Sequence, residues 1–168
     1  MREVPRMPDA VGNGRLVRNK QFFITGPEDG VFRGKASLQD GQHTMEVSLV
    51  VRQGTMEVLQ LEASIDAAPH TVCASAVEGL QKLIGMRIQP GLFGEMQQRV
   101  GGPRGCIHMN ELIREALQLV AAHFNQTRMR RMLSEGLTTE EILCWAEGVR
   151  SWTCVAAPDP VTMPKPSP

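Results

Sequence analysis

Apolar and polar residues alternate along three stretches in the first half of the chain. The clearest stretch is TMEVSLVVR, in which Met45, Val47 and Leu49 fall on one face of an extended chain. The same period of two runs through FRGKASLQ before it and MEVLQLEASI after it. Turns containing glycine separate these stretches, so the pattern predicts an antiparallel meander of three strands. The strands are expected near residues 31–39, 43–52 and 56–66, and their buried positions are Met45, Val47, Leu49, Leu59, Leu61 and Ile65.

The second half of the chain has the period of helices. Pro69 suits the first turn of a helix, where no backbone N–H is needed, and Gly85 can close that helix. Thr138 and Glu141 form a capping box for a last helix that ends near Gly148. A short helix is expected within residues 86–105. The long helix is expected at residues 107–125, with an apolar side of Met109, Leu112, Ile113, Ala116, Leu119 and Val120. Strands followed by helices indicate an α+β fold, with a three-stranded sheet and helices packed on one face.

The composition indicates one domain with a loose segment at each end. Residues 1–20 lack periodicity and are interpreted as a flexible arm, and residues 21–154 as the single α+β domain. Residues 155–168 contain five prolines and are interpreted as a disordered tail.

The same numbers exclude several functions. A net charge of +0 and an aromatic content of 4% argue against a nucleic-acid surface. No apolar stretch approaches the roughly 20 residues of a membrane span, and the N-terminus lacks the apolar region of a secretion signal. We therefore expect a cytoplasmic protein with no membrane and no nucleic-acid partner.

Four residues with metal-binding side chains lie at the ends of the expected elements. His43 begins the second strand, Cys73 lies in the first turn of the helix after the meander, and Cys106 and His108 open the long helix. Ends of elements can meet at one rim of such a fold, and two thiolates with two imidazoles suit Zn²⁺ or part of an iron–sulfur centre. The structural alternative is that the cysteines are small buried hydrophobes and His43 is a surface residue.

The spacing alone does not decide between these interpretations. Cys-x-His is not by itself a metal motif, and the chain lacks the paired Cys-x-x-Cys spacing that would be specific. The remaining candidates are interpreted as structural or exposed: His70, His123, Cys144 and Cys154.

The run RVGGPRGCIHMNEL resembles the signature of a bacterial family of uncharacterised domains. In that family a Gly-Gly-x-x-Gly-Cys-Thr-His-Leu-x-Glu-Leu run opens a helix, and this chain has Ile107 and Met109 in place of the Thr and Leu. The resemblance spans roughly residues 30–127 and includes His43 and a step from proline to Cys73. It implies a pattern of residues and no activity.

The order of elements is also similar to the iron–sulfur scaffold fold of the NifU N-terminal type, so the expected fold is NifU/SufE-like. In that fold the ligands come from the first hairpin, from the helix after the meander and from a late helix. The resemblance places His43, Cys73, Cys106 and His108 there. The scaffold's hairpin has Cys-Gly-Asp, whereas this chain reads Gly41-Gln42-His43. The difference removes one cysteine, which argues against cluster assembly but leaves metal binding open.

Three functions follow as alternatives. The first is a metal-binding scaffold, carrier or accessory protein that holds zinc or an iron–sulfur cluster, works with a protein partner and is not a catalyst. The second is a thiol-dependent enzyme or a persulfide sulfur-transfer protein that uses Cys106 with His108 as base. The third is a protein-interaction module with structural cysteines. The oligomeric state stays open.

Overall fold

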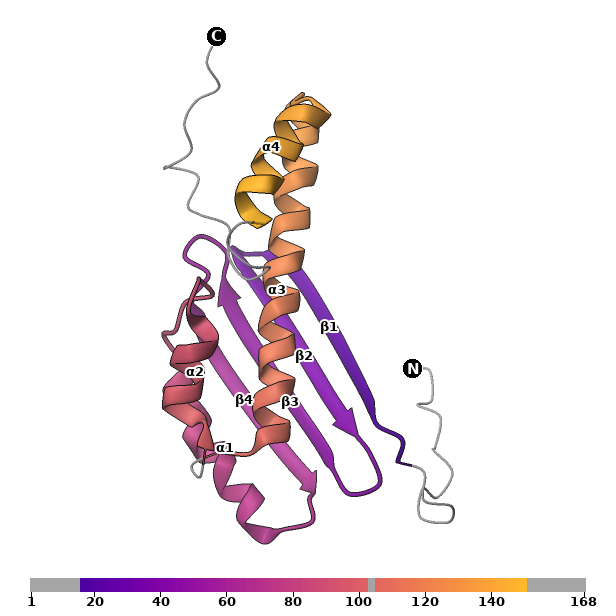
Figure 1. Ribbon diagram of the computed structural model, residues 1–168, viewed down its shortest axis with the longest axis vertical. Helices are drawn as coiled ribbons and strands as arrows, with labels where there is room; N and C mark the ends of the chain where they lie inside the picture. Colours follow the sequence, from indigo (N-terminus) through magenta and orange to yellow (C-terminus); the bar gives the residue numbers. More distant parts are fainter. Residues whose placement is uncertain (1–15, 103–104, 151–168) are drawn as a thin grey trace.

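The computed structural model describes residues 16–102 and 105–150, with the side chains of residues 71–72 and 147–150 excepted. Its centre is one four-stranded antiparallel sheet in the order β1-β2-β3-β4, so each strand pairs with its neighbour in the sequence (Figure 1). The strands are β1 (Asn19–Glu28), β2 (Val31–Gln39), β3 (Thr44–Arg52) and β4 (Val58–Ala67). The helices lie on one face of the sheet, so the α+β class is confirmed.

The prediction of three strands was wrong by one, because β1 was missed. Two of its residues, Asn19 and Lys20, fall in the segment that was interpreted as an arm. β1 is an edge strand, and its inward residues Phe22 and Ile24 are only half-buried. The adjacent apolar residues Phe22 and Phe23 hide the period of two in the sequence of this strand.

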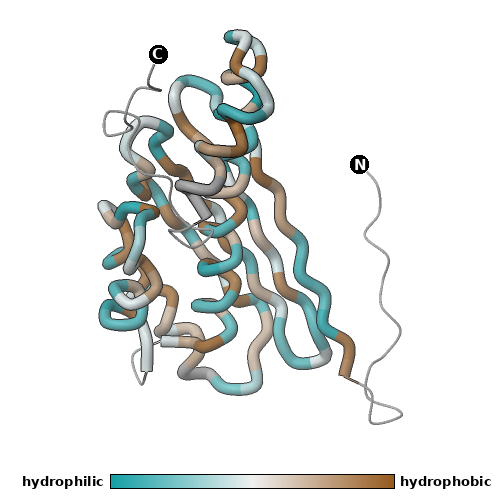
Figure 2. Tube along the Cα trace, turned by 45° about the horizontal axis from the view of Figure 1, so that its top comes forward, coloured by the Kyte–Doolittle hydropathy of each residue, from teal (hydrophilic) through white to brown (hydrophobic). Residues whose placement is uncertain are grey.

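The three predicted strands are present, with two changes of register where β4 pairs with β3, one at each end of the pairing. Val51 pairs with Val58, whereas Val50 pairs with Gln60, so Leu59 is an extra residue in a bulge. The bulge changes which positions face the core. Val58 and Leu61 are buried, and the expected core residue Leu59 is only half-buried. Elsewhere along the strands, hydrophobic and hydrophilic residues alternate (Figure 2).

The helix expected after Pro69 is divided into three short turns. They are η1 (Thr71–Ser75), α1 (Ala76–Gly79) and η2 (Leu80–Leu83). Ala76, Leu80 and Leu83 of these turns are buried. The later helices are α2 (Leu92–Val100), α3 (Ile107–Ser134) and α4 (Thr139–Arg150).

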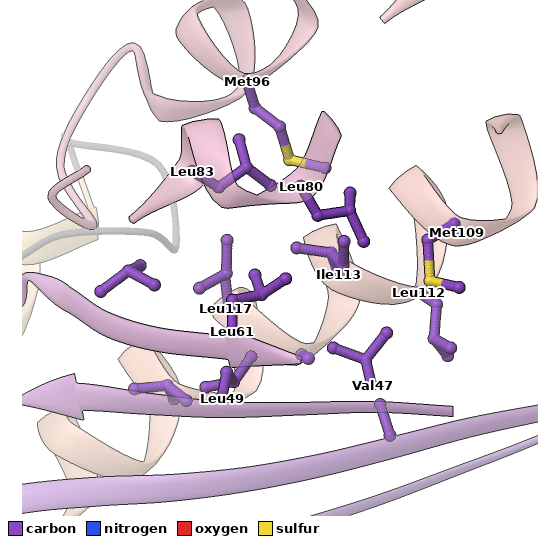
Figure 3. Packing of buried hydrophobic residues seen from close by; sticks show 14 of the residues in the cluster. Val47, Leu49, Leu61, Leu80, Leu83, Met96, Met109, Leu112, Ile113 and Leu117 are labelled. Atoms are coloured by element: carbon purple, nitrogen blue, oxygen red, sulfur yellow. The ribbon is translucent and has the colours of Figure 1, made fainter. Parts of the chain in front are cut away.

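The core lies between the sheet and the helices, and α3 runs across it. Figure 3 shows side chains of η2, α2 and α3 meeting those of β3 and β4. Leu117 of α3 belongs to this core, whereas the predicted core residue Leu119 is 40% exposed. The buried residues of α3 are Met109, Leu112, Ile113, Ala116, Leu117, Val120 and Ala121.

The second half of α3 extends beyond the sheet, and α4 packs back along it (Figure 1). Ile142 and Trp145 are the buried residues of α4. The predicted capping box is present. Thr138 N donates to Glu141 Oε2 at 2.7 Å, and Glu141 N donates to Thr138 Oγ1 at 3.3 Å. No helix within the described residues is long and apolar enough to cross a membrane.

Replacing Thr138 with alanine should destabilise α4 by about 1 kcal/mol, because the first-turn N–H group loses its acceptor. Amide hydrogen exchange should show faster exchange in α4 and little change in the sheet. The matched control is Thr139→Ala, an exposed threonine one position later. Equal effects of the two substitutions would contradict the capping role.

Candidate functional site

Several elements begin or finish at the same end of the sheet. The register pairs Asn19 with Gln39 and Thr44 with Ala67, so the start of β1, the β2–β3 turn and the last residue of β4 lie at this end. The first turn of α3 lies at the same end of the molecule (Figure 1). The expectation that element ends converge at a rim is therefore correct for these elements.

The carboxylate of Asp40 organises the β2–β3 turn. Its Oδ1 accepts from the backbone N–H groups of Gln42 at 2.9 Å and His43 at 2.7 Å, and its Oδ2 accepts from Arg18 Nε at 2.8 Å. The Asp40 side chain is only 1% exposed. Burial alone would raise the pKa of this carboxyl. The hydrogen bonds from Gln42, Arg18 and His43 outweigh burial and hold the pKa well below its usual range.

The same carboxylate orients the ring of His43. Nδ1 of His43 lies 2.9 Å from Asp40 Oδ1. An ionised carboxylate only accepts hydrogen bonds, so Nδ1 must be the donor, and a neutral ring then has its lone pair on Nε2. His43 is buried, so the alternative interpretation of this histidine as a surface residue was wrong.

The imidazole of His108 lies against that of His43. The two ring centroids are 4.2 Å apart, and the rings are tilted by 51°. Burial lowers the pKa of His108, and the neighbouring His43 and Arg18 lower it further, while Glu111 and Asp40 oppose the shift. The lowered pKa favours the neutral form of His108, in which one ring nitrogen can accept a proton or bind a metal.

Among the described residues, the two cysteines are not grouped with this histidine pair. Cys106 is the N-cap residue of α3 and makes no side-chain capping bond. Its side chain is buried and belongs to the hydrophobic core. Cys73 lies half-buried in η1. Within residues 16–102 and 105–150, no three or more His, Cys, Asp or Glu side chains are grouped so that they could hold a metal ion.

Sequence reasoning missed Asp40 and Arg18 as parts of this site. Asp40 lies three residues before His43, a spacing at which an aspartate often accepts from backbone N–H groups in a turn. No pattern in the sequence indicated a role for Arg18, which lies in the segment that was interpreted as an arm. Lys20 was missed too. Its Nζ pairs with Glu115 at 2.5 Å and lies 3.7 Å from Glu111, which ties β1 to α3.

The other histidine and cysteine positions lie apart from this pair where the structure describes them. His123 donates from Nε2 to the carbonyl oxygen of Gly26 at 2.9 Å and packs edge-on against Phe32. It thus anchors the end of β1 to α3. His70 and Cys144 are exposed. Cys154 and the predicted tail lie outside the described residues.

Comparison with known proteins gives one match. No curated protein and no solved structure matches the chain. Residues 26–122 match the family described as "Protein of unknown function (DUF2889)". The match covers more than half of the chain and includes Asp40, His43, Cys73, Cys106 and His108, while Arg18 and α4 lie outside it. The chain therefore belongs to DUF2889, a family of unknown function.

Proposed function

We propose that this protein is a cytoplasmic metal-binding scaffold, carrier or accessory protein whose site is built around His43 and His108. The observation that carries the proposal is the close pair of imidazoles, with ring centroids 4.2 Å apart. The buried His43 and the half-buried His108 repel one another when both are charged, whereas a metal ion between neutral rings binds both. Imidazole nitrogens suit zinc and iron, which are the metals that the sequence suggested.

Asp40 has the place of an outer-sphere residue in this proposal. Histidine ligands of metals usually donate their second ring N–H to a carboxylate, which fixes the ring and makes the free nitrogen more basic. The 2.9 Å bond between His43 Nδ1 and Asp40 Oδ1 has this form. It leaves Nε2 of His43 as the nitrogen available to a metal.

Cys106 and Cys73 are the proposed remaining ligands. Cys106 stands at the N-terminus of α3, where the helix dipole favours the thiolate that a metal needs. Its side chain belongs to the hydrophobic core, so the proposal includes a turn of the thiol towards the histidine pair. Two imidazoles and two thiolates suit a tetrahedral zinc site or a cluster with mixed ligands. The proposed resemblance to the NifU-type scaffold agrees with an accessory role.

The burial of Cys106 also weighs against the enzyme alternative. A nucleophilic thiol must be reached by its substrate, and Cys106 is only 9% exposed. The metal proposal requires only that the Cys106 thiol turn towards the histidine pair. A persulfide carrier that uses Cys106 needs the same access as an enzyme.

Metal titration of the untagged protein tests the proposal. We expect about one Zn²⁺ per chain, as a site of this ligand number requires. His43→Gln and His108→Gln should each weaken binding by about tenfold or more, because each removes one ligand. Cobalt substitution reports the ligand set, since a thiolate-to-cobalt charge-transfer band would appear in the wild type and be lost in Cys106→Ser.

Two controls make the result decisive. Cys144→Ser removes an exposed thiol on α4 and should leave binding unchanged. His123→Gln removes a histidine that bonds to Gly26 and should also retain the metal. Equal binding by the wild type and by both His43 and His108 variants would overturn the proposal. Rapid alkylation of Cys106 in metal-free protein, with no metal bound at any concentration, would favour the thiol enzyme instead.

A further inference from the structure

A cleft of about 550 Å³ lies between α2 and the first two turns of α3. Clefts of roughly 300–1,000 Å³ are the size that small molecules occupy in proteins. Among the described residues, α2 contributes Phe93, Met96 and Gln97, α3 contributes Ile107, Asn110, Glu111 and Arg114, and Gly102 and Gly105 line the cleft between the two helices. The two cysteines and the histidine pair are not part of its lining, so this cleft is a feature separate from the proposed metal site.

Arg114 marks one end of the cleft. Its guanidinium lies over the ring of Phe93, 4.3 Å from the centroid. Stacking on a ring occupies the face of a guanidinium and leaves its N–H groups at the edge for a planar acceptor. Within the described residues no carboxylate forms an ion pair with Arg114, and the neighbouring Glu111 is drawn towards Lys20 at 3.7 Å. Within the part of the chain that the structure describes, the N–H edge of Arg114 is therefore open to an added carboxylate.

Asn110 offers a different group near the middle of the cleft. Its Nδ2 donates to the carbonyl oxygen of Val100 at 2.9 Å, which fixes the direction of the amide. Its Oδ1 is buried and accepts no hydrogen bond from a described residue. A buried acceptor without a donor costs free energy, so a ligand N–H or O–H that reaches this oxygen through a small shift of the Asn110 side chain would be favoured.

The cleft also has apolar side chains, which lie beside the polar Gln97 and Glu111 and can contact an apolar body. Met96 is buried beneath it, and Ile107 is 67% exposed at the end opposite Arg114. Seven residues of helix separate Ile107 from Arg114, which corresponds to about 10 Å along the axis of α3. A ligand that reaches from one to the other is elongated and small.

We propose that this cleft binds a small, elongated carboxylic acid with an apolar body and one N–H or O–H donor. The carboxylate pairs with the edge of the Arg114 guanidinium, the donor meets Asn110 Oδ1, and the apolar body lies against Met96 and Ile107. The proposal does not depend on metal binding. Both sites use the first turns of α3, and the charge of Glu111 already acts on His108.

Titration with hippurate (N-benzoylglycine) tests this inference on the full-length protein in the presence of a chelator. Hippurate carries a carboxylate, an amide N–H and a phenyl ring in a row. We expect saturable binding in calorimetry, and the neutral amide hippuramide should bind about tenfold more weakly or worse, because it lacks the charge that a guanidinium pairs with. Arg114→Gln should weaken hippurate binding by a similar factor.

The matched control is Arg130→Gln, which removes an exposed arginine further along α3 and should leave the affinity unchanged. Arg114 is itself exposed, so its variant should keep the melting temperature of the wild type. Equal binding of hippurate and hippuramide, equal binding by Arg114→Gln and wild type, or no saturable binding of hippurate would each overturn the inference. Since the chelator removes metal, none of these results bears on the His43–His108 site.

Discussion

Replacing Gly105 with alanine should lower the free energy of unfolding by about 3 kcal/mol, the upper end for overpacking at a rigid site. A Cβ at this position would overlap the carbonyl oxygen of Val100, and it would lie 3.1 Å from Nδ2 of Asn110. These two groups are already hydrogen-bonded to each other at 2.9 Å. The new methyl group must therefore displace backbone or break that bond.

Urea unfolding followed by circular dichroism measures this effect, with Gly94→Ala as the matched control. Gly94 lies inside α2, and a Cβ there would meet no atom within 4 Å. Alanine in a helix interior is favoured over glycine by roughly 0.5–1 kcal/mol, so the control should be stabilised. A loss below about 0.5 kcal/mol in Gly105→Ala, a size ordinary for surface changes, would show that the backbone yields and that the close approach is not a constraint.

This close approach has a consequence for the candidate site. Gly105 immediately precedes the N-cap residue Cys106, and His108 follows in the first turn of α3. The small residue lets the chain pass close to the C-terminal end of α2 before α3 begins. The start of α3 thereby lies near the end of the sheet at which His43 precedes β3. Gly105 thus helps to place the first turn of α3 as well as to relieve crowding.

The parts of the fold with strong periodicity were predictable. Apolar and polar residues alternate in β2 and β3 because one face of each strand is buried. The long apolar stripe of α3 predicted a helix at this place. The misses follow from packing that a pattern does not contain. β1 is half-buried at the sheet edge, and the bulge at Leu59 changes the facing of β4 without changing its composition.

The candidate site was predictable in its location more than in its partners. His43 and His108 lie at element ends that share one edge, and antiparallel topology brings such ends together. Which way a side chain points from a helix start depends on the packing around it. For that reason the inward direction of Cys106 and the ion pair of Asp40 with Arg18 could not be read from spacing.

Asp40→Asn should lower the free energy of unfolding by about 2–3 kcal/mol at neutral pH. The substitution removes the buried carboxylate charge to which Arg18 and His43 donate hydrogen bonds. The amide can still accept from a backbone N–H of the turn. It cannot accept at both of its heavy atoms, so one of the two side-chain donors is left without a partner. Asp66→Asn is the control, since Asp66 is exposed on β4.

The pH dependence of this difference follows from the lowered pKa of Asp40. An unfolded aspartate titrates near about pH 3.9. The folded carboxylate gives its full stabilisation above that value and loses it as the pH falls towards its own, lower pKa. The gap in unfolding free energy between wild type and Asp40→Asn should therefore be constant above about pH 5 and narrow below about pH 4. A gap that stays constant into acid would mean that the carboxylate is not stabilised in the folded state.

The same variant connects the fold to the proposed metal site. If Asp40 orients His43 as an outer-sphere residue, Asp40→Asn should weaken zinc binding by about 10- to 100-fold while both imidazoles are still present. Asp66→Asn should bind zinc as the wild type does. A variant that loses stability but keeps the wild-type affinity would assign Asp40 to the β2–β3 turn alone. The hydrogen bond at His43 Nδ1 would then be a consequence of the turn and would have no part in holding a metal.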